Sequence, residues 1–444
     1  MDRTLFRAKY VVRSAKTLFA LSLVLAPSAA HAQTQTPAPA QTLAGPPPIR
    51  VEFDEAVRRA IERSPTIAQA TTQIAQAQAV VRQTRGTVLP SVNASVATTT
   101  YNASRGFEGA VTQSQNQLSV IGDVSMPLLA LSQWASVTQS RDQVEVTTRQ
   151  AADARTQIAS ATGRAYLAVI AAHRQIDVNE RALESSRAHL DYATKRLEGG
   201  AGSRLNQMRA AREVSAEEVQ LEVARLLLMR AQEALGVLMA ENGPVDSISE
   251  PVFEIPQNVA ESEWMNARPD VRAQQSVIAA TDRVLRDSWR DWTPTAHVAF
   301  APQYVTPSSL FLPSGSWRLL LSFTQPIYEG GQKRATKALR GIALDQTRLQ
   351  LSSVEIEARS QVRTAQQEVD GRLRAMASAQ RAASQAIEVL RITTSAYELG
   401  ATTNIEVIDA QREARDAEAA AVLAEDGVRI ARLDLLVALG RFPR

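Results

Sequence analysis

Cysteine is absent from all 444 residues of the chain. Its absence excludes disulfide bonds, thiolate zinc sites, iron–sulfur clusters and cysteine nucleophiles. It also leaves no thiol that could be acylated, so we expect no lipid tether on the protein.

Long apolar segments are missing as well. After residue 32, no window holds 18 consecutive apolar residues, so the sequence predicts no transmembrane helix. The one apolar run, 18–26, follows five basic residues and precedes Ala30-His31-Ala32, a small-x-small cleavage pattern. These features predict a secretory signal peptide at 1–32, because the run is too short for a membrane anchor.

Without this signal peptide, the chain has no excess of basic residues. The net charge of +3 comes from 49 basic and 46 acidic residues, of which 44 and 45 remain after residue 32. This balance argues against nucleic-acid binding. The three remaining histidines, His173, His189 and His297, have no acidic or cysteine partners at ligand spacing. We therefore expect no metal, no cofactor and no enzymatic activity.

What the sequence does contain is a tandem duplication. Pro65 and Pro90 bound a helical stretch, and Pro269 and Pro294 bound a second one 204 positions later. Near-constant spacing of prolines, glycines and segments indicates one long unit present twice. We predict a signal peptide at 1–32, a disordered linker at 33–50, a first repeat at 51–245 and a second repeat at 246–442.

Each repeat reads as helix, β-hairpin, very long helix, tight turn and long helix. No proline interrupts the long helices of either repeat. A continuous helix from Gly331 to Leu399 would be about 100 Å long at roughly 1.5 Å per residue. Within it, apolar residues recur every seven positions at Ile342, Leu349 and Ile356, which is typical of coiled-coil packing.

The two hairpins are expected at about 91–126 and 295–325. Apolar and polar residues alternate in 295–304 and 317–324, and more weakly in the first copy. This pattern fits a transmembrane barrel strand and equally a soluble sandwich strand. Four strands cannot close a barrel, and lipid tolerates no open sheet edge, so a membrane barrel would need several chains. A secreted chain with four such strands favours the shared barrel.

Four segments carry a resemblance to a known family. They are FDEAVRRAIERSPTIAQA at 53–70, VVRQTRGTVLPSVNAS at 80–95, QPIYEGG at 325–331, and YELG followed by IEVIDAQ within 397–411. In this order they resemble the TolC-type outer-membrane efflux protein family, the outer membrane factors of tripartite efflux or type I secretion systems. The resemblance spans about 51–442.

The resemblance implies a mainly α-helical, tandem-duplicated TolC-like fold with membrane β-structure. Three protomers with four strands each would form one 12-stranded barrel in the bacterial outer membrane, and their helices would form a long α-helical barrel in the periplasm. The segment at about 246–265 would belong to an equatorial domain. The implied partners are two further copies of the chain, outer-membrane lipid, a periplasmic membrane-fusion adaptor and an inner-membrane pump.

The same resemblance places the periplasmic end of this duct at the two helix-turn-helix tips. Adaptor contacts are implied at Gly199, Gly200, Gly400, Ala401 and Thr402. Glu406 and Asp409 match acidic family positions that ring the entrance, although acids at a helix start also serve as dipole and solubility features. Tyr397 matches a tyrosine linked to closure.

The first repeat departs from this acidic pattern at the tip. Asn206 and Arg209 stand where the second repeat has Glu406 and Asp409. We hypothesise that Arg204 or Arg209 pairs with one of these carboxylates and helps to hold the tip closed.

The expected function is passive conduction of substrates delivered by an inner-membrane transporter, with a proton-driven resistance-nodulation-division (RND) pump and multidrug efflux preferred. A channel of a type I protein secretion system is the alternative within the same class. A secreted coiled-coil fibre or adhesin is the alternative from another class, but it does not need four amphipathic strands between its helices.

Overall fold

The computed structural model describes residues 47–256, 259–309 and 313–442, and these described residues form one unit. The predicted signal peptide and residues 33–46 of the predicted linker lie outside the described residues. The predicted end of that linker at residue 50 is wrong. Strand β1 (Ile49–Val51) has already begun there and pairs in parallel with β6 (Val245–Ser247). The side chain of Val51 is fully buried and fixes this segment in the core.

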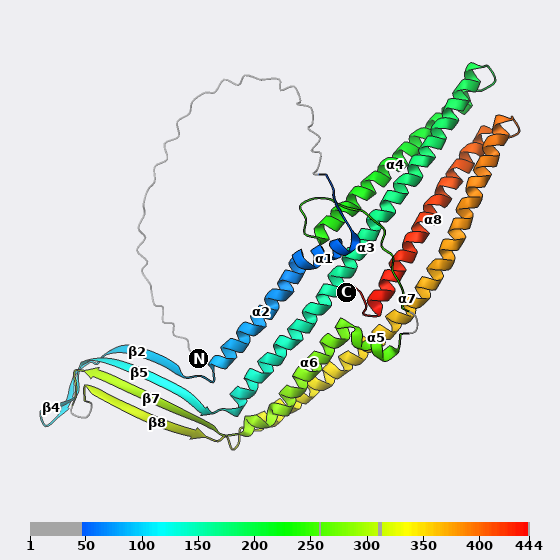
Figure 1. Cartoon of the computed structure of the whole chain (residues 1–444). Helices are drawn as coiled ribbons and strands as arrows, with labels where there is room; N and C mark the ends of the chain where they lie inside the picture. The colour runs from blue at the N-terminus through cyan, green and yellow to red at the C-terminus, as the bar shows by residue number, and fades with distance from the viewer. Residues whose placement is uncertain (1–46, 257–258, 310–312, 443–444) are drawn as a thin grey trace, which may run out of the picture. The chain divides into compact units, whose positions relative to one another are not determined.

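The helices follow the duplicated order expected from the sequence (Figure 1). In the first repeat they are α1 (Phe53–Arg63), α2 (Pro65–Gly86), α3 (Leu131–Glu198) and α4 (Arg204–Leu238). In the second repeat they are α5 (Glu261–Ala267), α6 (Pro269–Arg286), the 3-10 helix η1 (Asp287–Trp292), α7 (Gln332–Glu398) and α8 (Asn404–Ala438). The continuous helix predicted for the second repeat is confirmed by α7, which has 67 residues.

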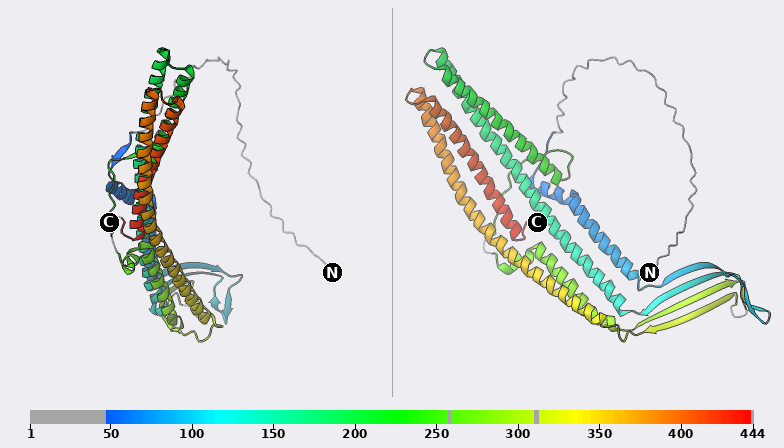
Figure 2. Two further views of the ribbon diagram at one scale, coloured as in Figure 1. Left: turned by 90° about the vertical axis from the view of Figure 1, so that its right-hand side faces the viewer. Right: turned by 180° about the vertical axis from the view of Figure 1, so that it is seen from behind.

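Two long helical hairpins dominate the packing. Helix α3 packs along α4, α7 packs along α8, and α3 also contacts α8, so that the two hairpins are joined (Figure 2). Helices α2 and α6 extend the pairing along the first parts of α3 and α7. Pro65 and Pro269 stand in the first turns of α2 and α6, where a helix needs no amide hydrogen. Among the described residues, no helix is both long and apolar enough to cross a membrane.

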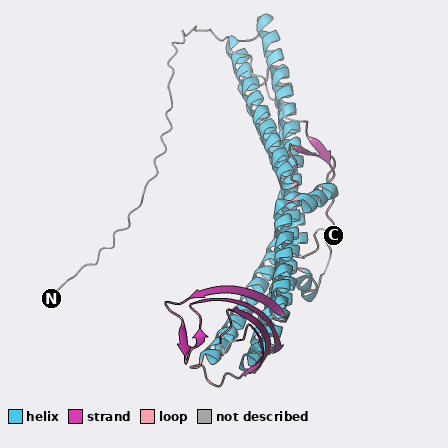
Figure 3. Cartoon of the chain, turned by 90° about the vertical axis from the view of Figure 1, so that its left-hand side faces the viewer, coloured by secondary structure: helices cyan, strands magenta, loops and turns pink. Residues whose placement is uncertain are grey.

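One four-stranded antiparallel sheet gathers at one end of these helices (Figure 3). Its order is β2 (Ser91–Thr100), β5 (Asn116–Leu129), β7 (Thr295–Thr306) and β8 (Gly315–Thr324). The pairing of β5 with β7 joins the repeats, with Val120 opposite Tyr304. Both predicted hairpins are confirmed, although β5 continues three residues beyond 126. Strands β2 and β8 are edges with no outer partner among the described residues.

The sheet exposes large apolar side chains in a single chain. Leu319, Leu321 and Phe323 on β8 are 62%, 68% and 67% exposed. The loop that connects β2 to β5 contains a second, small hairpin of β3 (Arg105–Phe107) and β4 (Ala110–Gln113). This hairpin was not predicted from the sequence. An edge strand with exposed apolar residues requires a covering partner or a lipid environment.

The main core lies at the middle of α3. Tyr166 and Leu167 are fully buried there with Leu235 of α4 and Leu433 of α8. The Tyr166 hydroxyl lies within hydrogen-bonding distance of the main-chain oxygens of Ser249, at 2.8 Å, and Val51, at 3.2 Å, so it ties β1 and the segment after β6 to α3. Ser249, near the start of the predicted equatorial segment, therefore lies against the middle of α3.

Candidate functional site

The turns that end α3 and α7 lie at the end of the hairpins opposite the sheet (Figure 1). Gly200 and Gly400 have φ of 75° and 78°, a left-handed conformation that glycine adopts without strain and that ends a helix. The amide of Ala201 donates to Arg196 O at 2.9 Å, and the equivalent bond at the second turn is 2.8 Å long. The structure places all five residues predicted at the tips in these turns: Gly199, Gly200, Gly400, Ala401 and Thr402.

Next to the turns, on the side that faces the rest of the helices, a group of side chains joins the two hairpins. We call this group, His189, Tyr192, Arg196, Tyr397 and Asn404, the tip cluster. His189 Nε2 lies 2.8 Å from Asn404 Oδ1, and both side chains are buried. The His189 and Tyr397 rings lie 5.4 Å apart between centroids. The tip cluster therefore links α3 directly to α7 and α8.

Arg196 provides the cationic part of the tip cluster. Its guanidinium carbon lies 5.4 Å from the centre of the Tyr397 ring and 5.9 Å from that of Tyr192. Its Nη1 also donates to Tyr397 O at 3.4 Å, and the Tyr192 hydroxyl donates to Glu398 O at 3.3 Å. A cation in contact with the faces of aromatic rings is stabilised by their quadrupoles, so Arg196 helps to hold the last turn of α7 against α3.

Burial disfavours the charged form of the histidine in the tip cluster. Burial lowers the pKa of His189 from 6.5, and the hydrogen bond with Asn404 only partly opposes this shift. The Asn404 amide also donates to Asn206 O at 3.5 Å, which brings the start of α4 into the same network. Neutral imidazole can be donor at one nitrogen and acceptor at the other, so the bond to Asn404 needs no charge.

Further along the hairpins, buried ion pairs connect α4 to α8. Glu213 accepts from Arg412, and Glu217 Oε1 accepts from Arg415 at 2.6 Å. Both glutamates are 1% exposed. Losing one partner of such a pair is costly because it leaves a buried charge uncompensated. These pairs therefore fix α8 on α4 in one register.

The predicted gate residues differ in their exposure to solvent. Glu406 and Asp409 lie together on the exposed face of the first turns of α8, whereas Tyr397 is buried. Asp409 has Arg412 at 3.9 Å, one turn further along its own helix. Within the described chain, neither Arg204 nor Arg209 forms an ion pair with these carboxylates, so the hypothesised pair is absent inside one protomer. Asn206 instead lies in the first turn of α4, where its backbone amide donates to the side chain of the N-cap residue Ser203 at 3.2 Å.

Comparison with known proteins decides the family. The sequence model described as "Outer membrane efflux protein" matches residues 56–241 and 309–441, more than half of the chain. The chain belongs to the outer membrane efflux protein family. Outer membrane protein OprJ of Pseudomonas aeruginosa is 25% identical over 414 residues, which cover 88% of this chain and 84% of OprJ. The pyoverdine export outer membrane protein OpmQ of the same organism is 23% identical, covering 87% and 84%.

Solved structures give the same result for the fold. The structure of CusC, described by its transmembrane channel formation, matches with a TM-score of 0.76 at 17% identity, covering 87% of this chain and 92% of CusC. The TolC-like fold and the family resemblance read from the sequence are thus confirmed. This outer membrane efflux protein belongs to a family of transport proteins and not of enzymes. Its described residues hold no group of three or more metal-ligating side chains.

Proposed function

We propose that this outer membrane efflux protein is the exit duct of a tripartite pump and works as a homotrimer. It would conduct substrates passively after a periplasmic adaptor and an inner-membrane pump, of the RND type, have delivered them. Three four-stranded sheets would form one 12-stranded barrel, and three pairs of helical hairpins would form the periplasmic tube. Cyclic symmetry would close both parts with one repeated interface.

The unpaired sheet edges carry this proposal. Strands β2 and β8 have backbone groups on their outer edges that pair with no other strand of the described chain, and β8 exposes Leu319, Leu321 and Phe323. In lipid each unpaired group costs several kcal/mol, and a single four-stranded sheet is too small to close on itself. Pairing β8 of one protomer with β2 of the next removes every edge and turns the apolar residues toward lipid.

The tips would form the periplasmic entrance and the adaptor contact. Glu406 and Asp409 are exposed on α8, so threefold symmetry could bring six carboxylates around one aperture. A ring of this kind favours cations. Arg204 and Arg209 would pair with the carboxylates of a neighbouring protomer. The hypothesis that these arginines help to hold the tip closed is thus kept as a contact between protomers.

Single-channel conductance in planar bilayers tests this function. The purified protein should run as a heat-modifiable trimer and form ion-conducting channels. Asp409→Lys should weaken block by divalent cations at least several-fold, because it removes the charge that concentrates them. Asp345→Lys is the matched control, since Asp345 is an exposed carboxylate on α7 far from the turn. Failure to form channels would refute the duct, and unchanged block by cations would refute only the ring.

The cargo class needs a separate experiment. OpmQ is named for pyoverdine export, and on the strength of this likeness we propose small-molecule efflux here. Deletion of the gene should increase susceptibility to several unrelated toxic compounds. A normal susceptibility profile together with loss of a secreted polypeptide would favour a type I secretion channel instead.

A further inference from the structure

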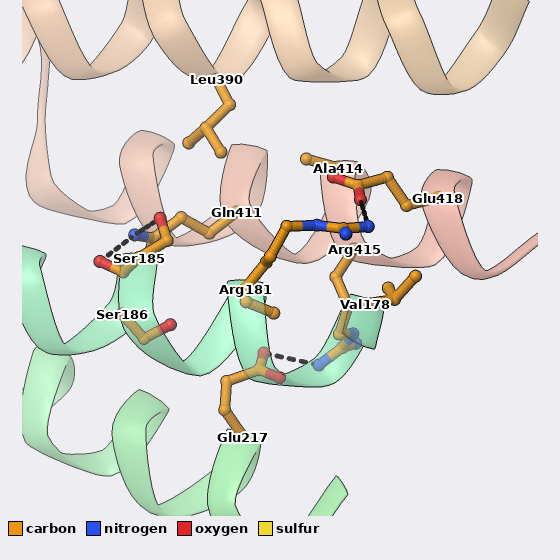
Figure 4. A pocket seen from close by; sticks show the side chains of 11 residues that line it. Val178, Arg181, Ser185, Ser186, Glu217, Leu390, Gln411, Ala414, Arg415 and Glu418 are labelled. Atoms are coloured by element: carbon orange, nitrogen blue, oxygen red, sulfur yellow. Dashed lines mark hydrogen bonds and ion pairs between the residues drawn. The ribbon is translucent and has the colours of Figure 1, made fainter. Parts of the chain in front are cut away.

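A small cavity lies where the two helical hairpins meet (Figure 4). Its volume is about 60 Å³, and its walls come from all four helices α3, α4, α7 and α8. Ser186 lines it from α3, Glu217 from α4, Leu390 from α7 and Gln411 from α8. A water molecule needs roughly 10–15 Å³ of such space, so the cavity has room for a few.

Three polar atoms of residues that line this cavity have no hydrogen-bond partner in the described chain. They are Ser186 Oγ, Glu217 Oε2 and Gln411 Oε1. The three side chains are 2%, 1% and 7% exposed, so bulk solvent does not reach them freely. Buried polar groups are nearly always paired, because an unmade hydrogen bond costs more than a made one gains. Three such groups around one cavity indicate a missing common partner.

The neighbouring donors do not supply that partner. Arg415 donates to the other carboxylate oxygen of Glu217 at 2.6 Å, and Arg181 donates to Glu418 at 2.7 Å. The Gln411 amide nitrogen donates to Ser185 Oγ at 3.1 Å and to Ser185 O at 3.2 Å, so only the amide oxygen is left without a partner among the described residues. The oxygens of Glu217 and Gln411 need a small hydrogen-bond donor, and the same molecule must be able to accept from the Ser186 hydroxyl.

The charges around the cavity identify this donor as neutral. Two guanidinium groups and two carboxylates line it, already matched as Arg415 with Glu217 and Arg181 with Glu418. A metal cation would meet two arginines at close range, so like-charge repulsion excludes it. Water meets every requirement, since it donates two hydrogen bonds and accepts two.

We propose that a buried water cluster fills this cavity and bridges the two hairpins. Its hydrogen bonds would join Ser186 and Glu217 of the first hairpin to Gln411 of the second. At this level the seam between the hairpins is therefore held by water together with the ion pairs of Arg415 with Glu217 and Arg181 with Glu418, and not by dry apolar packing as in the core around Tyr166. This inference does not depend on the proposed export function.

Direct observation of the cavity is the first test. A structure of the full-length protein in detergent, at a resolution that places water, should show ordered solvent within hydrogen-bonding distance of Glu217 Oε2 and Gln411 Oε1. An empty cavity would overturn the proposal. So would a direct hydrogen bond between these two oxygens, because it would mean that Glu217 is protonated and needs no water.

An isosteric pair of substitutions at Ala182 is the second test. Ala182 lines the cavity from α3, and valine and threonine are both β-branched, differ by a methyl group against a hydroxyl, and have similar helix propensity. Valine would expel water without replacing its hydrogen bonds, so Ala182→Val should lower the thermal midpoint by about 2–4 °C relative to Ala182→Thr, whose hydroxyl can bond the stranded acceptors. If the cavity is dry, Ala182→Val fills it with apolar atoms and is the more stable variant. If neither variant folds, the observation of solvent in the unsubstituted protein decides.

Discussion

At the scale of single residues, Asp426 on α8 is a carboxyl group that folding places in an unfavourable environment. Burial raises its pKa from 3.8 to about 6, since Arg429 and Arg174 only partly offset the lost solvation and Glu250 adds repulsion. The folded chain therefore binds this proton more tightly than the unfolded chain. Its contribution to stability is largest at low pH and is lost as the pH rises from 3.8 through about 6.

We expect Asp426→Asn to stabilise the protein near neutral pH, because the amide carries no charge to desolvate. The gain should be about 1–2 kcal/mol after allowance for solvent screening, and it should vanish near about pH 4. Thermal unfolding followed across this pH range measures it. Glu425→Gln is the neighbouring control: burial alone would raise the pKa of Glu425, but Gln380, Arg174 and Arg429 lower it overall, so this change should destabilise at neutral pH. A gain from Asp426→Asn that does not vary with pH would contradict the argument.

At the scale of elements, the tip cluster determines how firmly the last turns of α3 and α7 stay together. We expect Arg196→Met to loosen both turns, because it removes the cation that contacts the rings of Tyr192 and Tyr397 and the bond to Tyr397 O. Two cation–π contacts are worth roughly 1–2 kcal/mol together, which corresponds to about 5–30-fold faster amide exchange around the turns.

Hydrogen exchange read by mass spectrometry measures this effect at both turns. The control is Lys195→Met, which removes a neighbouring exposed cation whose ion pair with Asp191 lies within its own helix. Faster exchange at the α3 turn alone would mean that Arg196 does not connect the hairpins.

The sequence predicts those elements whose signal is local. Freedom from proline was enough for α7, and strict alternation was enough for β7 and β8. The short β3–β4 hairpin was missed because three or four residues are too few to show alternation. The turns of the candidate site were predicted from Gly200 and Gly400, but the tip cluster was not. His189 meets Tyr397 and Asn404 only because two repeats pack together, and only the spacing of Tyr192 and Arg196, four residues apart before the turn, gave a local hint.

At the scale of the whole molecule, the decisive question is whether β8 of one chain pairs with β2 of another. The absence of native cysteine allows a clean answer, because any disulfide bond must then join introduced residues. We expect Ser95→Cys on β2, combined with single cysteines scanned along 317–323 of β8, to give covalent dimers and trimers on oxidation. Ser95 and these positions lie on opposite edges of the sheet, so they cannot reach each other within one chain.

The largest product distinguishes closure from open assembly. A closed ring of three stops at the trimer, because the third bond joins the last chain to the first, whereas an open sheet or a fibre continues into longer ladders. The matched control is Val120→Cys with Tyr304→Cys, opposite each other on the central strands β5 and β7, which should cross-link inside one chain without changing its size. If that control forms its disulfide bond while no β2–β8 pair does, the edges do not meet, and the shared barrel is wrong. Products of more than three chains would also contradict the shared barrel, because they require a sheet whose edge stays open.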